Sequence, residues 1–312
     1  MVDIVCSPHL SVASLPSPSP VSEGESALLP SLQPEQPQLS LRVACAKGTE
    51  TSFIAHQYAT YPFRLSGNLR LDPTDQNRVY AYIMNASPGI LAGDDLRLSV
   101  EVSDRASLYL TDQSATKVHS KPVGGAAAKV EWTIRVGADA YFEFMPEPII
   151  LFPSAALTHK MNVTLHPQGR MLLSEIVVPG RMARGELYAF EHFQSRLRIE
   201  NLEGKLCFVD NLRLLGQANR LKDNHFFTGF PILANFIIVV PGVSLEQLVM
   251  LLQQYVINES VMQVCESSLP GCHGLLVRAI ATQTNVLKAY QRHLLSCVRQ
   301  LTKHSPIPLV PK

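Results

Sequence analysis

Residues 96–146 read LRLSVEVSDRASLYLTDQSATKVHSKPVGGAAAKVEWTIRVGADAYFEFMP. Three segments of this stretch, 96–102, 129–136 and 140–146, alternate apolar and polar residues and are rich in β-branched or aromatic side chains. This alternation is typical of β-strands with one buried face, and no helical pattern of similar strength interrupts it. We therefore predict a mainly β fold and not a fold in which strands and helices alternate.

Similar runs extend from about Leu41 to Gly216, and the turns between them recur at a nearly constant distance. Turn signals lie at Asp104, Gly137, Gly169 and Gly204, which are separated by 33, 32 and 35 residues. A period in this range indicates stacked supersecondary units. With strands as the elements, the prediction is an elongated, β-helix-like stack of hairpins with two sheets, similar to a solenoid.

The C-terminal third is predicted to be helical. Ser244 followed by Gln247 resembles a capping box, and apolar residues then recur at helical spacing. We expect helices near 244–256 and 282–301, and the prolines from Pro306 onward prevent continuation of the second one. The two helices are expected to cover a sheet face or to present a groove to a partner helix.

Composition divides the chain into three parts. Residues 1–40 are rich in Pro and Ser and are predicted to be a disordered leader, residues 41–304 a single β-rich domain, and residues 305–312 a disordered tail. The formal net charge of +1 gives no general attraction to nucleic acid or to an anionic membrane. The apolar run 226–240 contains Pro231 and is too short for a convincing membrane span. Six cysteines without a CxxC pair favour a soluble, cytoplasmic protein with free thiols.

Three acidic residues follow the turn glycines at the same distance. Glu143, Glu175 and Asp210 each lie six residues after Gly137, Gly169 or Gly204. If the hairpins stack in register, the three carboxylates form a column with about 4.8 Å between strands. Like charges at that spacing need cations, protons, buried arginines or water to neutralise or solvate them. The alternative is that these acids lie on a solvated face or pair with arginines.

Motifs of known catalytic machinery are missing from the sequence. It contains no GxSxG, no HExxH and no P-loop. Cys272-His273 could bind a soft metal ion, or could be a packed cysteine beside a surface histidine. Paired carboxylates, such as Glu143 with Glu147, would suit a polysaccharide hydrolase or lyase. However, the chain has only one tryptophan with which to stack on sugars.

Four ordered blocks resemble the UreD (UreH) family of urease accessory proteins. They are NASPGILAGDDLRLSVEV (85–102), ASLYLTDQSATKVH (106–119), MPEPIILFPSA (145–155) and VVPGRMARGELYAFEHF (177–193). The resemblance covers about 61–216 strongly and continues more weakly to the C-terminus. One departure is that Pro88 stands where the family usually has a first of two adjacent glycines.

The resemblance implies a fold and a function. It implies a β-helix-like stack with two helices near one side, and a protein that is not an enzyme. It implies a complex with UreF, UreG and the urease apoenzyme, with a dimeric assembly through that complex as one arrangement. It also implies that nickel passes through an interior, water-filled passage and that no cofactor is bound permanently.

The residues expected to line or gate this passage are acidic: Asp94, Glu143, Glu147, Glu175, Glu186 and Asp210. A row of carboxylates should bind Ni²⁺ weakly and exchange it quickly, because tight binding needs imidazole or thiolate. Two of the acids have structural alternatives, since Asp94 could cap a turn and Arg181 is expected to pair with Glu186 or a column acid. The remaining alternatives are an assembly scaffold without a metal route, and the polysaccharide enzyme.

Overall fold

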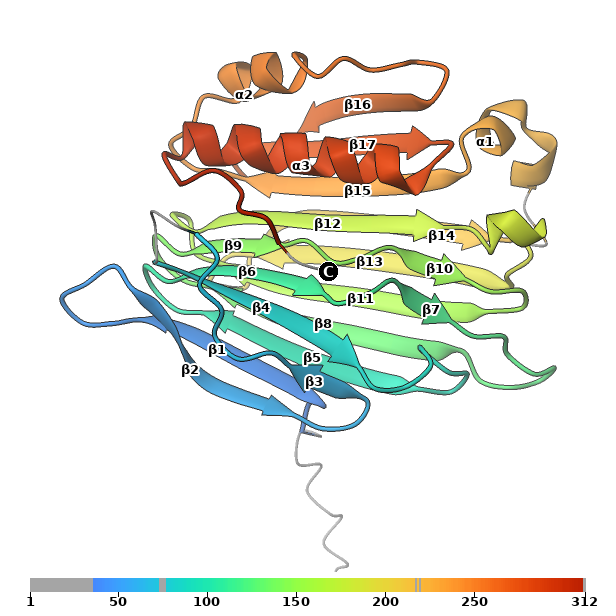
Figure 1. Cartoon of the computed structure of the whole chain (residues 1–312), viewed down its shortest axis with the longest axis horizontal. Coiled ribbons are helices and arrows are strands. Elements are labelled where there is room, and N and C mark those ends of the chain that lie inside the picture. Colours follow the sequence, from blue (N-terminus) through green and yellow to red (C-terminus); the bar gives the residue numbers. More distant parts are fainter. Residues whose placement is uncertain (1–35, 73–76, 217, 219, 311–312) are drawn as a thin grey trace, which may run out of the picture. The chain divides into compact units, whose positions relative to one another are not determined.

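A computed structural model describes residues 36–72, 77–216, 218 and 220–310 (Figure 1). The predicted leader therefore lies almost wholly outside the described residues, as do the last two residues of the predicted tail. The last residues of the predicted leader and the first residues of the predicted tail are described, and neither supports disorder there. A strand already begins at Leu39, and the backbone carbonyls of Ser305 and Pro306 accept hydrogen bonds from Arg299.

Among the described residues, the strands form two sheets. The first sheet has, in spatial order, β14 (Leu206–Leu215), β13 (His192–Glu200), β11 (Ala156–Leu165), β8 (Ala128–Val136), β5 (Asp95–Val102), β1 (Leu39–Cys45) and β2 (Ser52–Ala59). The second has β16 (Met262–Ser268), β17 (Gly274–Ala281), β15 (Ile232–Val239), β12 (Arg170–Val178), β9 (Tyr141–Phe144), β6 (Ser107–Asp112), β4 (Arg78–Asn85) and β3 (Phe63–Leu65). In addition, β10 (Ile149–Leu151) pairs with β12, and β7 (Thr116–Val118) pairs with β10.

The prediction of a mainly β fold is confirmed, whereas a β-helix-like stack of hairpins is not. The turns near Asp104, Gly137 and Gly169 each connect a strand of the first sheet to a strand of the second, so they do not close hairpins. Only the turn at Gly204, among these four, joins antiparallel neighbours, β13 and β14. The repeated spacing nevertheless reflects a regular feature, because one turn hydrogen-bonds to the next: Gly137 N–H donates to Val102 O at 2.9 Å.

The two faces of the second sheet are both covered. One face packs against the first sheet through an apolar core that includes Phe142, Phe144 and Leu173. The other packs against the helices through a second apolar cluster that includes Tyr141, Leu172 and the inner side of α3 (Thr284–Leu301). In Figure 1, α3 runs along β15 and β17. A side chain on this sheet therefore points either between the sheets or toward the helices.

The prediction of a helical C-terminal third is only partly correct. Helices α2 (Leu245–Leu252) and α3 agree with the two predicted ones, and short helical segments occur at η1 (Met182–Arg184), η2 (Arg220–Asp223) and α1 (His225–Gly229). However, β15, β16 and β17 extend the second sheet. Strand β15 was not predicted because both of its faces are buried, which removes the period-two alternation that marks a strand.

The predicted capping residue of α2 is confirmed. The Ser244 side chain accepts a hydrogen bond from Gln247 N–H at 3.2 Å. We expect Ser244→Ala to lower the free energy of unfolding by about 1 kcal/mol, because one helix N–H loses its partner. Urea unfolding of the purified chain measures this loss. Ser268→Ala, at an exposed strand position, is the control, and an equal effect of both changes would contradict the assigned cap.

Candidate functional site

The space between the two sheets contains a row of polar side chains in an otherwise apolar core. Each comes from a strand position that faces inward, where neighbours two residues away are apolar. In β11, for example, His159 lies between Leu157 and Met161, both of which are buried in the inter-sheet core. We call this set the inter-sheet polar row: His159, Glu175, Ser195, Asp210, Asn235 and Arg278.

Strand register brings the members of the row together. Across the second sheet, Glu175 pairs with Asn235, and Asn235 pairs with Arg278. Across the first sheet, His159 pairs with Ser195. These members thus lie at the same level within each sheet, whereas Asp210 is offset from Ser195 by two residues.

Within this row, Glu175 of the second sheet contacts two residues of the first sheet. Its carboxylate oxygen lies 2.8 Å from His159 Nδ1 and accepts a hydrogen bond of 2.8 Å from Ser195 Oγ. Because the carboxylate can only accept when ionised, His159 Nδ1 must carry the proton in that contact. The Glu175 side chain is only 9% exposed. Among the described residues, its hydrogen-bond partners are this histidine and this serine, neither of which carries a permanent charge.

Two cavities meet at Glu175. The larger has a volume of about 210 Å³, and its lining includes His159, Glu175 and Glu147. The smaller, of about 20 Å³, is lined by Glu175, Asp210 and other residues of both sheets. A volume of 10–15 Å³ on this measure holds about one water molecule. The first cavity therefore has room for several waters or a hydrated ion, and the second for one water.

One acidic lining residue of each cavity forms an ion pair. Near the larger cavity, Glu147 accepts hydrogen bonds of 2.8 and 3.1 Å from Lys288 Nζ of α3. Beyond the smaller cavity, Arg278 Nη2 donates to Asp210 Oδ1 at 2.6 Å. The cationic side chains are 40% and 48% exposed, respectively. Both acids therefore have partners that can move into solvent.

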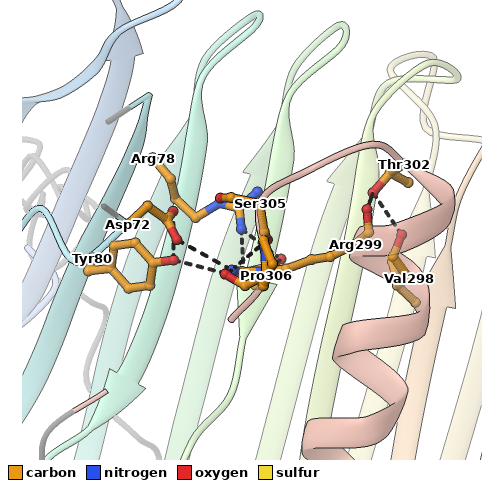
Figure 2. Close-up of polar contacts among 9 residues, drawn as sticks. Asp72, Arg78, Tyr80, Val298, Arg299, Thr302, Ser305 and Pro306 are labelled. Atoms are coloured by element: carbon orange, nitrogen blue, oxygen red, sulfur yellow. Dashed lines mark hydrogen bonds and ion pairs between the residues drawn. The ribbon is translucent and has the colours of Figure 1, made fainter. Parts of the chain in front are cut away.

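Glu143 does not face the cavities. It points to the helix side of the second sheet, where it is fully buried and is held by Arg78 and Arg299. Arg299 Nη2 donates to Glu143 at 2.6 Å and to Tyr80 Oη at 3.1 Å. Figure 2 shows Arg299 reaching from the end of α3 toward Tyr80 and Asp72. We call Glu143, Arg78, Arg299, Tyr80 and Asp72 the buried ion cluster.

The charge of Glu143 is neutralised by the protein itself. Burial raises the pKa of this carboxyl, but the charges of Arg78 and Arg299 outweigh that effect, so its pKa lies below the ordinary value. Buried arginine is one of the groups that the sequence analysis named as able to neutralise these acids. Glu143 is thus a structural acid that fixes the end of α3 to the sheet.

The predicted column of Glu143, Glu175 and Asp210 is wrong. Asp210 belongs to the first sheet, and Glu143 pairs in register with Leu172. Glu175 lies three residues further along β12, so it points to the opposite face. The cause is the length of the turns: β9 begins four residues after Gly137, whereas β12 begins immediately after Gly169.

Two other predicted residues also lie apart from the cavities. Asp94 Oδ2 accepts a hydrogen bond of 2.8 Å from Leu91 N–H, as expected for the turn-capping alternative. Glu186 accepts two hydrogen bonds, of 2.6 and 2.5 Å, from Arg181. These bonds hold the pKa of Glu186 below its ordinary value. Of the six predicted acids, Glu147, Glu175 and Asp210 line the cavities.

The sequence reasoning missed the neutral and cationic members of the row. His159, Ser195, Asn235 and Arg278 were not predicted because none of them is an acid at a fixed distance from a turn glycine or a histidine in a closely spaced pair. The sequence of β11 nevertheless contains a usable signal, because His159 stands at a position where the alternation of the strand calls for an apolar residue. The same signal identifies Ser195 in β13, between the buried Phe193 and Leu197.

The arrangement suits a weakly held cation better than a tightly held one. Within the described ranges, no three His, Cys, Asp or Glu side chains converge as a ready metal site. Near Glu175, one carboxylate and one imidazole are in reach, and the other positions around an ion would fall to hydroxyl groups and water. Such a donor set accepts borderline divalent ions such as Ni²⁺.

None of the helices in the part of the chain that the structure describes is long and apolar enough to cross a membrane.

Comparison with known proteins assigns the family. The model of the UreD urease accessory protein family matches residues 36–312. A urease accessory protein UreD of Trichodesmium erythraeum is 42% identical over 88% of this chain and 98% of its own length. The UreD of Haloarcula marismortui is 29% identical over 80% and 82%, and that of an Anaeromyxobacter species is 28% identical over 95% and 99%. The chain therefore belongs to the UreD family of urease accessory proteins.

Proposed function

We propose that this chain takes part in urease maturation by passing nickel to the urease apoenzyme, in a cytoplasmic complex that also contains UreF and UreG. In this proposal the chain links urease to the other two proteins. Nickel moves through the hollow region between the sheets as cargo, and the chain holds no permanent cofactor. A polysaccharide-cleaving activity is not proposed, because the family has a non-catalytic role in urease maturation.

The observation that carries the proposal is the environment of Glu175. Two buried glutamates lie on opposite faces of the same sheet. Glu143 is neutralised by two arginines, whereas the contacts of Glu175 are His159 and Ser195. A buried carboxylate without a fixed countercharge is costly. Its position beside two cavities supports a role in which a passing cation supplies the positive charge.

The donors in the row match the requirements of transfer. Carboxylate and water exchange Ni²⁺ readily, and a single imidazole adds some preference for it over Mg²⁺ or Ca²⁺. A site with several imidazoles or thiolates would hold the ion in place. The row is therefore suited to brief contacts with a moving ion.

The two flanking ion pairs support a gated route. Glu147–Lys288 and Asp210–Arg278 each combine a mostly buried acid with a cation that is nearly half exposed. Because the lysine and the arginine already reach solvent, an arriving divalent ion can displace them and replace their positive charge at the acid. In the proposal, Glu147 and Asp210 act at the two ends and Glu175 in the middle.

An assembly scaffold without a metal route is the second candidate. Exposed apolar side chains at Met250 and Val256 favour a docking role for the region of α2. This candidate predicts that changes inside the cavity are harmless, provided that the complex still forms. The two candidates can therefore be separated by measuring assembly and urease activation in the same samples.

We predict that Ala115→Phe reduces urease activation without preventing assembly. Ala115 is half-buried and lines the larger cavity, so a benzyl side chain there should narrow the route. The chain would be co-expressed with urease and the other accessory proteins, and both ureolysis and co-purification would be measured. Ala127→Phe, at a half-buried position outside the described cavity linings, is the matched control.

Three outcomes decide between the candidates. Loss of ureolysis with Ala115→Phe alone, at normal co-purification, supports the route. Normal ureolysis with both variants supports the scaffold without a metal route. Loss of co-purification with Ala115→Phe would show that this position acts on assembly, and the transport argument from it would fail.

A further inference from the structure

A cysteine of the first sheet occupies a β-bulge at the sheet edge. In the β13–β14 pair, Ile199 is opposite Phe208 and Glu200 is opposite Leu206, so Cys207 has no partner in register. Bulges of this kind re-aim a side chain. The half-buried Cys207 packs against the inter-sheet core.

The turn between β16 and β17 lies directly on this bulge. At Gly271 of that turn, a Cβ atom would lie 2.2 Å from the carbonyl oxygen of Cys207, so only glycine allows the approach. The next residue, Cys272, also packs against the inter-sheet core, and a hydrogen bond with the Cys207 side chain contributes to the raised pKa of its thiol. A thiol of the first sheet and a thiol from a turn of the second sheet are therefore neighbours.

We propose that Cys207 and Cys272 form a reversible disulfide, a modification site that covalently joins the first sheet to the second. The oxidant is a low-molecular-weight disulfide such as oxidised glutathione. The inference rests on the contact between bulge and turn, and it is independent of the nickel route.

The reaction proceeds as two thiol–disulfide exchanges. Burial, together with the neighbouring Cys207, raises the pKa of Cys272 to about 12, so Cys272 remains a thiol at neutral pH. Cys207 reacts first: its sulfur attacks glutathione disulfide, forms a mixed disulfide and releases one glutathione, which takes up the Cys207 proton. The sulfur of Cys272 then attacks Cys207, releases the second glutathione and transfers its proton to it. The chain loses two hydrogens, and one glutathione disulfide becomes two thiols.

The other described cysteines have different surroundings. Cys297 is buried in α3, Cys265 is exposed on β16, and the half-buried Cys45 ends β1. His273, beside Cys272, is turned to the backbone, with Nε2 2.7 Å from the carbonyl oxygen of Val243. Because a carbonyl can only accept, Nε2 carries a proton there, and only Nδ1 of this ring could bind a metal ion. Within the described residues, no group of three His, Cys, Asp or Glu side chains forms a metal site around Cys272 and His273.

The bond would restrict the end of the molecule where the polar row reaches the sheet edge. Cys207 and Asp210 are on β14, while Cys272 lies two residues before the start of β17, which carries Arg278. Strands β14 and β17 belong to different sheets, and the ion pair Asp210–Arg278 already links them without a covalent bond. Oxidation would make that link permanent until a reductant removes it.

The test uses the purified full chain in buffers of defined reduced-to-oxidised glutathione ratio, followed by alkylation, intact mass and peptide mapping. We expect oxidation to remove two hydrogens and to yield a linked Cys207–Cys272 peptide, reversed by excess reductant. The thermal midpoint should rise by several degrees on oxidation and fall again on reduction. Cys265→Ser should leave the linked peptide unchanged, and Cys207→Ser should abolish it.

Two results would overturn the inference. One is that Cys265 acquires glutathione while no linked Cys207–Cys272 peptide appears at any ratio. The other is a linked peptide that joins a different pair of cysteines. Since the wild-type chain provides both readouts, a folding defect in a variant does not affect the conclusion.

Discussion

Glu143→Gln is expected to lower the free energy of unfolding by about 3–5 kcal/mol, a large loss for a single substitution. Glutamine has nearly the same shape, but it removes the charge that compensates Arg78 and Arg299, both of which are 1% exposed. Two buried guanidinium groups would then share one remaining carboxylate, that of Asp72, 3.8 Å from Arg299. Urea unfolding followed by circular dichroism measures the loss.

An exposed ion pair provides the control for this prediction. Glu200 pairs with Arg198, and these side chains are 29% and 36% exposed. Glu200→Gln should cost no more than about 1 kcal/mol, because water solvates both charges. If Glu143→Gln cost no more than Glu200→Gln, the buried ion cluster would not be what holds α3 to the second sheet.

The contribution of Glu143 should also depend on pH in a defined direction. Its pKa is lowered from an ordinary value of 4.5, so the folded state favours the carboxylate. The stabilisation is complete above the unfolded-state pKa and is lost as the pH falls through the lower, folded-state pKa. The difference in stability between wild type and Glu143→Gln should thus be constant from about pH 8 to pH 5 and shrink at more acidic pH. A difference that grows on acidification would contradict the pKa direction.

Glu175→Gln is expected to reduce urease activation at least about tenfold, the scale of loss when a metal ligand or its supporting group is removed. Glutamine can still accept a hydrogen bond from Ser195, so the packing between the sheets should be kept. What it lacks is the negative charge that attracts a divalent ion. We therefore expect loss of activation with little change in stability or assembly.

Asp94→Asn is the matched control for Glu175→Gln. Asp94 was predicted as a passage residue, but its carboxylate caps a turn away from the described cavities. Asparagine can accept the same hydrogen bond from Leu91. Ureolysis by cells that carry Asp94→Asn should be close to wild type. Equal losses with both changes would mean that activation depends on acids in general and not on those between the sheets.

Patterns within short stretches of the sequence predicted the strands with one buried face and the start of a helix. Alternation identified strands with one covered face, such as β8 and β11, and the Ser244 cap located the start of α2. The period of about 33 residues corresponds to turns that hydrogen-bond to one another. Each of these signals lies within a few residues, or repeats at a fixed distance.

The features that the sequence did not predict depend on contacts between residues far apart in the chain. Glu143 and Glu175 look equivalent by spacing, yet turn length places them on opposite faces of the second sheet. One partner of Glu143 is Arg299, which is 156 residues away in the chain. No local pattern contains that pairing. Strand β15 was missed for a related reason, since its burial on both faces depends on helices that follow it.

The most direct test of the route counts nickel in urease after delivery through a defined complex. Purified urease apoenzyme, UreF, UreG and either wild-type chain or the Glu175→Gln variant would be assembled to equal stoichiometry and supplied with nickel and GTP. Nickel in the separated urease would then be measured by mass spectrometry. We predict filled urease with the wild-type chain and about one tenth of that nickel, or less, with Glu175→Gln. Equal nickel in both samples would contradict a route between the sheets.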